Sequence, residues 1–176
     1  SGNIAYTNLD LDKEKLKFVQ INNNIDKFLS SEQLKKHKSI TIKDILIADG
    51  KFMASYLEEM KSDCWTISII IAEINYEDMK FKKLFSPGEC VNKKEAWNTD
   101  FSFHQTGGRI VKLNSKEILF TTGEYRSRHL AQKSDSIFGK LIKINIEDSS
   151  YSIVAKGFRN AQGLYYDKEY NFALLT

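Results

Sequence analysis

The chain has 176 residues, of which 41% are hydrophobic and 28% charged, so a wholly disordered chain is excluded and one folded domain is expected. Its longest apolar stretch, residues 67–72, is broken by Ser68 and is far too short to span a bilayer. The net charge of +3 is mild and the lysines are spread along the sequence, which argues against a nucleic-acid partner because such partners require a clustered basic face.

Three segments contain an alternating apolar strand, a polar turn and a second alternating strand, and we call them the outer hairpins. They cover residues 4–20, 67–85 and 141–155. The second contains Ile-Asn-Tyr-Glu-Asp at 74–78, and the third contains Ile-Asn-Ile-Glu-Asp at 144–148. A repeated motif within a repeated strand pattern indicates an array of equivalent structural units.

A second set of strand–turn–strand units, the inner hairpins, alternates with the outer ones. Each has Asp or Asn at its turn, and these side chains bond nearby backbone groups and tolerate positive φ. The inner hairpins cover residues 45–54, 109–121 and 164–175, with Asp49, Asn114 and Asp167 at the turns.

Two hairpins recurring every 50 to 70 residues, roughly, are typical of the four-stranded antiparallel blades of an all-β propeller. We predict an outer hairpin at 1–22, blades at 39–90 and 105–158, and the start of another blade at 159–176. Because propellers close with four to eight blades, we expect these residues to be part of a longer protein or a ring that other chains complete. The alternative is a β-sandwich of about ten to twelve strands.

Two cysteines, Cys64 and Cys90, are equally far from Glu77 along the chain. In a hairpin centred on Glu77 they would face each other and could form a disulfide. Pro87 and Gly88 could disturb that register, and two unrelated buried thiols are the alternative. A disulfide would favour an oxidising compartment.

The strongest candidate for acid–base chemistry is His104, which precedes Gly107, Gly108 and an inner hairpin. In a propeller, the turn that enters an innermost strand faces the central channel. Imidazole titrates near neutral pH, so His104 could act as a general base there. A plain polar contact in a loop is the alternative.

The turn before the next inner hairpin contains Arg159, Asn160 and Gln162. A guanidinium suits carboxylates, and the two amides provide donors and acceptors. These side chains could bind a ligand or could instead bond neighbouring backbone groups between blades.

Four segments of the chain match, in order and approximate spacing, motifs of the glucose/sorbosone dehydrogenase family. The chain therefore resembles soluble quinoprotein aldose sugar dehydrogenases over residues 101–176. The matching segments are His-Gln-Thr-Gly-Gly-Arg-Ile-Val at 104–111, Thr-Thr-Gly-Glu at 121–124, Gly-Lys-Leu-Ile-Lys-Ile-Asn at 139–145 and Phe-Arg-Asn-Ala-Gln-Gly-Leu at 158–164.

This resemblance implies a six-bladed propeller that oxidises an aldose sugar with pyrroloquinoline quinone (PQQ) and Ca²⁺. It implies that His104 takes the proton of the anomeric hydroxyl while hydride passes to the quinone. It further implies that Arg159 and Asn160 hold the cofactor, whose carboxylates suit a guanidinium. The family's calcium-binding stretch would follow Thr176.

Two functions remain open, and a hydrolase propeller such as a lactonase is a weaker third, because the sequence shows no convincing set of calcium ligands. Some members of the family have an acidic residue before the base, whereas this chain has Phe103. A non-catalytic propeller that binds carbohydrate or protein is therefore the alternative to the sugar dehydrogenase. The implied address is periplasmic or extracellular.

Overall fold

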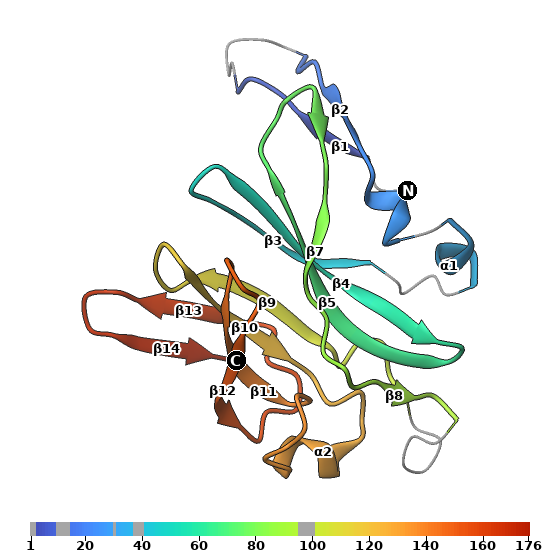
Figure 1. Ribbon diagram of the computed structural model, residues 1–176, viewed down its shortest axis with the longest axis vertical. Coiled ribbons are helices and arrows are strands. Elements are labelled where there is room, and N and C mark those ends of the chain that lie inside the picture. Colours follow the sequence, from blue (N-terminus) through green and yellow to red (C-terminus); the bar gives the residue numbers. More distant parts are fainter. Residues whose placement is uncertain (1–2, 10–14, 30, 37–40, 95–100) are drawn as a thin grey trace.

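The computed structural model describes an all-β chain of several antiparallel sheets, which confirms the predicted fold class (Figure 1). A five-stranded sheet and a four-stranded sheet lie side by side, and a two-stranded hairpin at the C-terminal end lies next to the four-stranded sheet (Figure 1). The described residues are 3–9, 15–29, 31–36, 41–94 and 101–176.

The first sheet, which we call blade 1, has the strand order β3-β4-β5-β7. Its β3–β4 connection is a tight turn in which Asp49 and Gly50 have φ of 50° and 71°. Consecutive residues with positive φ are the requirement of a two-residue hairpin turn, which Asp-Gly meets at little cost. The strands are β3 (Ile42–Ala48), β4 (Lys51–Lys61), β5 (Cys64–Glu73) and β7 (Lys82–Phe85), and β8 (Val91–Asn92) also pairs with β5.

Blade 2 repeats this architecture in the order β9-β10-β11-β12. All of its neighbouring strands are antiparallel, as in blade 1. Its strands are β9 (Gly107–Lys112), β10 (Glu117–Thr122), β11 (Lys140–Asn145) and β12 (Tyr151–Lys156), and the next hairpin consists of β13 (Leu164–Asp167) and β14 (Phe172–Leu175).

The repeated motif of the outer hairpins has a local structural cause. The Asn75 side-chain oxygen accepts a hydrogen bond from the Glu77 amide (2.8 Å), and Asn145 accepts one from the Glu147 amide (2.8 Å). Both asparagines thus form the same turn at the same place in their blades. The repeat in the sequence records this turn chemistry.

The second outer hairpin was predicted as two continuous strands, and this prediction is wrong for its second half. Met79 belongs to β6 (Asp78–Met79), which pairs in parallel with β2 (Val19–Asn23), and within this second half only β7 pairs with β5. The Asn24 amide side chain explains the break, because it accepts from the Phe81 amide (2.7 Å) and donates to the Phe81 carbonyl (3.1 Å). A side chain therefore replaces a strand neighbour at this point.

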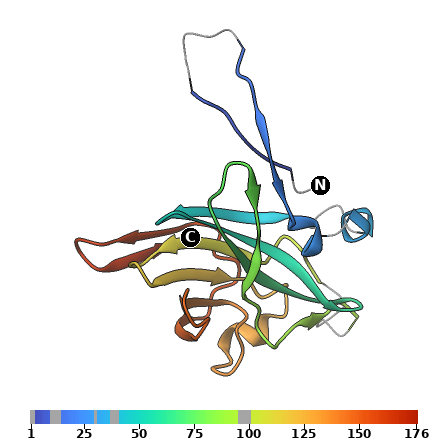
Figure 2. The same cartoon turned by 45° about the horizontal axis from the view of Figure 1, so that its top comes forward.

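The N-terminal hairpin of β1 (Ile4–Tyr6) and β2 projects away from the two blades (Figure 2). It is followed by the 3₁₀ turn η1 (Ile25–Lys27) and the helix α1 (Ser31–Lys36), and α2 (Arg128–Gln132) lies between β10 and β11. Residues 39–40, at which the first blade was predicted to begin, and residues 1–2 and 10–14 of the first hairpin lie outside the described residues. The predicted blade limits stay predictions.

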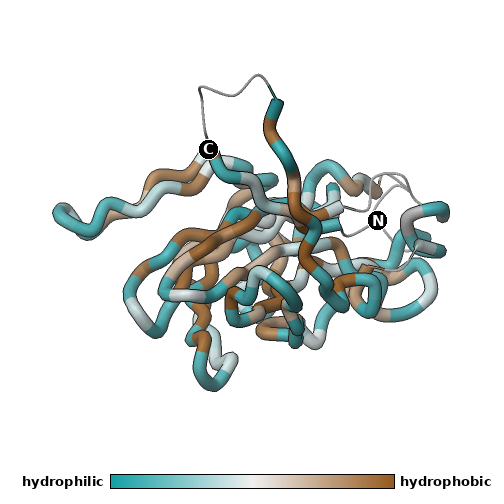
Figure 3. The backbone as a smooth tube through the Cα atoms, turned by 90° about the horizontal axis from the view of Figure 1, so that it is seen from above, coloured by the Kyte–Doolittle hydropathy of each residue, from teal (hydrophilic) through white to brown (hydrophobic). Residues whose placement is uncertain are grey.

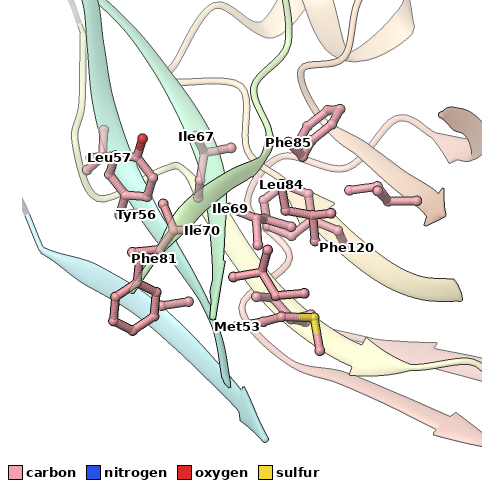
Figure 4. Packing of buried hydrophobic residues seen from close by; sticks show 14 of the residues in the cluster. Met53, Tyr56, Leu57, Ile67, Ile69, Ile70, Phe81, Leu84, Phe85 and Phe120 are labelled. Carbon is pink, nitrogen blue, oxygen red and sulfur yellow. The ribbon is translucent and has the colours of Figure 1, made fainter. Parts of the chain in front are cut away.

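The core lies mainly on both faces of blade 1 and between the two blades. At least six successive residues are buried in each of β4 and β5. Because successive side chains point to opposite faces of a strand, both faces of these strands are buried. Met53 and Ile69 lie on the side of blade 1 that faces Phe120 of blade 2 (Figure 4). The tube coloured by hydropathy shows the apolar strands in the middle and hydrophilic turns at the periphery (Figure 3).

Cys64 and Cys90 form a disulfide with a Cα–Cα distance of 5.4 Å. The register differs from a plain hairpin, because Ile69 pairs with Phe85 whereas Trp65 pairs with Val91. Val91 is thus six positions from Phe85, while Trp65 is four positions from Ile69. The extra residues surround Pro87, which cannot donate to the ladder, and they leave Cys90 beside Cys64.

None of the helices in the described ranges has the length and apolarity that a bilayer crossing requires. Within the same ranges, the sheets stand next to one another without closing a ring (Figure 1).

Replacing Ile69 by alanine should lower the free energy of unfolding by about 2–5 kcal/mol, because Ile69 is fully buried and the cavity would be closed by both blades. Ile47→Ala is the matched control, since Ile47 is 61% exposed and should cost less than about 1 kcal/mol. Urea unfolding of both variants checks this. Equal losses would contradict the placement of the core.

Candidate functional site

The candidate site lies at the end of the blades where β9 and β13 begin and β10 ends. Three loops meet there, and their backbones are hydrogen-bonded to one another. The Gly123 amide donates to the Thr106 carbonyl (2.7 Å), the Tyr125 amide to Gln105 (2.9 Å), and the Glu124 amide to Arg159 (3.1 Å). The loops that carry the predicted residues His104 and Arg159 are therefore joined to a common third loop.

His104 lies on the exposed side of the first loop. Its amide donates to the Ser102 hydroxyl (3.3 Å), and its carbonyl accepts from the Gln162 amide side chain (3.3 Å). These contacts fix the backbone of His104 and leave the imidazole accessible. The preceding Phe103 packs edge-on against buried Trp65, with ring centroids 4.9 Å apart. The residue before His104 is thus held by the packing of an apolar ring and offers no carboxylate to the imidazole.

Arg159 lies in the loop before β13, and its side chain is 59% exposed. With the Gln105 amide turned as its neighbours require, the Gln105 nitrogen donates to Glu124 Oε1 (2.8 Å) and its oxygen accepts from Arg159 Nη2 (3.2 Å). The direct distance from Arg159 Nε to Glu124 Oε1 is 4.0 Å. Gln105 therefore bridges a buried carboxylate and an accessible guanidinium.

Asn160 has a contact between two of the loops. Its side-chain oxygen accepts a hydrogen bond from the Gly107 amide (3.0 Å), at the first residue of β9. The neighbouring Gln162 carbonyl accepts from Arg109 Nε. Arg109 in turn lies 3.4 Å from Asp44 of blade 1. Asn160 and Gln162 thus connect the start of β13 to the start of β9 and, through Arg109, to blade 1.

Sequence reasoning assigned no role to Glu124, although it noted the Thr-Thr-Gly-Glu segment. Glu124 is 1% exposed, and within the described part of the chain its Oε2 atom accepts no hydrogen bond. Burial raises the pKa of this carboxyl, while the positive charges of Arg159, Arg128 and Arg126 and the Arg126 backbone amide act in the opposite direction. The signal available in the sequence was an acidic residue after a glycine at the end of a buried strand.

A small pocket of about 190 Å³ opens beside this carboxylate. It is lined by Glu124, Arg128, Ala131, Gln132, Gly157 and Arg159. Its wall therefore combines a hydrogen-bond acceptor that is not satisfied with two guanidinium donors. Such a wall suits polar groups that both donate and accept.

The backbone of the third loop is strained beside Glu124. Tyr125 and Arg126 have φ of 53° and 70°, in the left-handed region that costs a non-glycine residue about 1–3 kcal/mol. The Tyr125 ring is fully buried and stacks on Phe101 at 5.4 Å. Packing of Tyr125 therefore holds a turn that brings the Glu124 carboxylate beneath Arg159.

Within the described ranges, no three His, Cys, Asp or Glu side chains lie close enough together to hold a metal ion. The cations of the site are guanidinium and ammonium groups. Lys43 also approaches it, with Nζ 3.3 Å from the Phe103 carbonyl, and burial lowers the pKa of this lysine.

The fold is that of part of a β-propeller, and the candidate site is a polar, glycine-rich junction of loops where β9 and β13 begin. The family model "Glucose / Sorbosone dehydrogenase" matches residues 48–173. The chain belongs to the glucose/sorbosone dehydrogenase family. A comparison with curated proteins finds no match.

Three solved structures have a similar fold. The soluble aldose sugar dehydrogenase of Escherichia coli in its apo-form is 19% identical, with a TM-score of 0.62 over 78% of this chain and 43% of that chain. A structure described as glucose dehydrogenase is 16% identical, with a TM-score of 0.59 over 73% and 41%. Another glucose dehydrogenase is 17% identical, with a TM-score of 0.55 over 73% and 44%. The chain thus spans less than half the length of these structures.

Gly123→Ala should disrupt the junction of the loops. A Cβ atom at Gly123 would lie 2.2 Å from the Gln105 carbonyl oxygen and 2.5 Å from its carbon, so the backbone would have to move. We expect a loss of about 1–3 kcal/mol in the free energy of unfolding. Gly88→Ala is the control, because a Cβ there meets nothing within 4 Å. Chemical denaturation that finds Gly123→Ala as stable as Gly88→Ala would contradict the described junction.

Replacing Glu124 by glutamine should change how stability depends on pH. Because the folded-state pKa of Glu124 is raised, the folded protein holds its proton more tightly than the unfolded chain. Protonated Glu124 therefore contributes to the free energy of unfolding at low pH. This contribution is lost as pH rises above the pKa of the unfolded chain, about 4.3, and through the higher pKa of the folded protein. Urea unfolding between pH 4 and pH 7 should show Glu124→Gln gaining relative to wild type as pH rises. A constant difference would show that Glu124 is not the group concerned.

Proposed function

We propose that the chain forms part of a quinone-dependent aldose sugar dehydrogenase, which oxidises a sugar hydroxyl with PQQ. Family membership supports this class of activity. The observation that carries the proposal is the convergence of the loops of His104, Arg159 and Asn160 on one end of the blades, through hydrogen bonds between Gln162 and His104 and between Asn160 and Gly107.

In this proposal His104 is the general base. Its accessible imidazole accepts the proton of the anomeric hydroxyl, and its backbone contacts hold it at the mouth of the site. Proton removal by a positioned base contributes roughly 10²–10⁴ in rate. Gln105 and Glu124 hold Arg159 nearby without shielding it from solvent.

The residues present fit an anionic quinone. Arg159 presents an accessible guanidinium, and the contact of Asn160 with Gly107 uses the side-chain oxygen rather than the nitrogen. Arg159 would hold a carboxylate of PQQ and Asn160 would donate to a carbonyl oxygen. When bound, the quinone supplies the hydride acceptor. Ca²⁺ would be held by a part of the protein that follows Thr176.

One observation favours the second candidate, a non-catalytic propeller that binds carbohydrate or protein. Arg159 and Asn160 already have partners within the chain, so their presence also has a structural explanation. In that case the pocket beside Glu124 would bind hydroxyl groups without a redox step.

We also propose a periplasmic or extracellular address, which the Cys64–Cys90 disulfide supports because such bonds persist in oxidising compartments. The ring would be completed by further chain of the same protein or by a partner.

His104→Asn should lower kcat roughly 10²–10⁴-fold in the protein that carries this chain, loaded with PQQ and Ca²⁺, because the base is lost while the side chain stays polar. Dye reduction with a panel of aldoses measures this. His129→Asn is the matched control, since His129 is an exposed residue of α2.

Unchanged turnover in His104→Asn would remove His104 from the reaction. Absence of dye reduction in the wild type, together with no PQQ binding by calorimetry, would reject the dehydrogenase and leave the binding propeller.

A further inference from the structure

Glu89 belongs to blade 1 but contacts the loop that carries the candidate site. It lies between β7 and β8, where its carboxylate accepts two hydrogen bonds from blade 2. Oε1 accepts from the Ser136 hydroxyl (2.9 Å), and Oε2 accepts from the Ile137 amide (2.9 Å). Hydrogen bonds to a charged acceptor are stronger than neutral ones, so this clamp fixes the end of the loop that follows α2.

Buried Lys140 continues the clamp. Its Nζ atom donates to the carbonyls of Phe138 (2.6 Å), Leu130 (2.9 Å) and Ala131 (3.0 Å). Burial lowers the pKa of Lys140, and the opposite charge of Glu89 acts against this shift. The ammonium thus ties the C-terminal end of α2 to the segment that Glu89 holds.

Phe138 connects this segment to the site. The ring is fully buried and packs edge-on against Tyr125, with centroids 5.5 Å apart. Tyr125 is the strained residue that follows Glu124, and its amide donates to the Gln105 carbonyl. A contiguous set of contacts therefore runs from Glu89 through Phe138 and Tyr125 to the carboxylate beneath Arg159.

The backbone of Glu89 is anchored on both sides. Cys90, the next residue, is bonded to Cys64 in β5, and buried Pro87 lies two residues earlier with its φ fixed by the ring. β8 pairs with β5 through two residue pairs, and the Ser86 hydroxyl donates to the Glu58 carboxylate (2.8 Å). The disulfide adds a covalent link to blade 1 directly beside Glu89.

We propose that Glu89 is a positioning residue for the candidate site, and that the Cys64–Cys90 disulfide holds Glu89 in place. Reduction of the disulfide in blade 1 would then make residues 123–139 of blade 2 less well ordered. Cleavage by a dithiol reductant transfers two electrons and two protons to the cystine, gives one thiol each on Cys64 and Cys90, and leaves the reductant as a disulfide. The inference goes beyond the proposed dehydrogenase and stands whether or not the chain catalyses a reaction.

Hydrogen exchange and NMR titration test this on the chain without cofactor or substrate. In Glu89→Gln, with the disulfide intact, we expect the Ile137 amide to exchange about tenfold faster, because a charged acceptor is lost. The pKa of Glu124 should fall toward its ordinary value as packing around Tyr125 loosens. Reduction of the wild type by a dithiol should produce both effects. In Glu89→Gln, reduction should add little, because both changes act on one clamp.

Two references make the result specific. Glu77→Gln removes an exposed carboxylate at the tip of the outer turn and should change neither readout. The Ile74 amide, bonded to the Gly50 carbonyl (2.8 Å), reports on blade 1 as a whole and should keep its protection.

Three results would overturn the proposal. The first is an unchanged Ile137 amide after reduction. The second is an unchanged Glu124 titration in Glu89→Gln, which would confine Glu89 to a structural role. The third is an equal increase in the exchange rates of the Ile74 and Ile137 amides on reduction, which would show that the disulfide stabilises the whole fold rather than this loop.

Discussion

The position of the candidate site depends on the close approach of β9 to blade 1. A Cβ atom at Gly108 would lie 2.6 Å from Lys43 Cβ, so only glycine, with φ of 106° here, allows the two backbones to meet. The Ser55 hydroxyl donates to the Gly108 carbonyl (2.5 Å), and the Asp44 carboxylate accepts from the Ile110 amide (2.9 Å). These bonds fix where β9 starts and hence where the loop containing His104 leaves the sheet.

The loops of the site are held together largely by backbone hydrogen bonds, so some substitutions there change the loop structure as well as any ligand contact. Asn160 both faces the site and bonds the first amide of β9, so its removal would disturb the loops as well as any ligand contact. Arg159 is a cleaner reporter of binding, because its guanidinium is more than half exposed and its partners are side chains. Loss of Arg159 would, however, leave Glu124 buried beside fewer compensating charges.

Alternation and turn chemistry were sufficient to predict an all-β fold of antiparallel hairpins, because both are local properties of the sequence. The turns at Asp49 and Asn114 follow from their own side chains and neighbours. The parallel pairing of β6 and the role of Glu89 were not predictable in this way. Each depends on a side chain that bonds backbone far along the chain, such as Asn24 on Phe81 or Glu89 on Ile137, and no periodicity records such contacts.

The protonation of Glu124 depends both on how the fold buries its carboxyl and on the charges around it. Burial favours its protonated form, whereas the guanidinium of Arg159 favours the ionised form. An anion that drew Arg159 outward would remove part of the charge that supports the carboxylate, so its binding would be thermodynamically linked to proton uptake at Glu124. The strained turn at Tyr125 and the packing of Phe138 determine how deeply the carboxylate is buried. The strength of this linkage is therefore set by contacts that begin outside the site, in the adjoining blade.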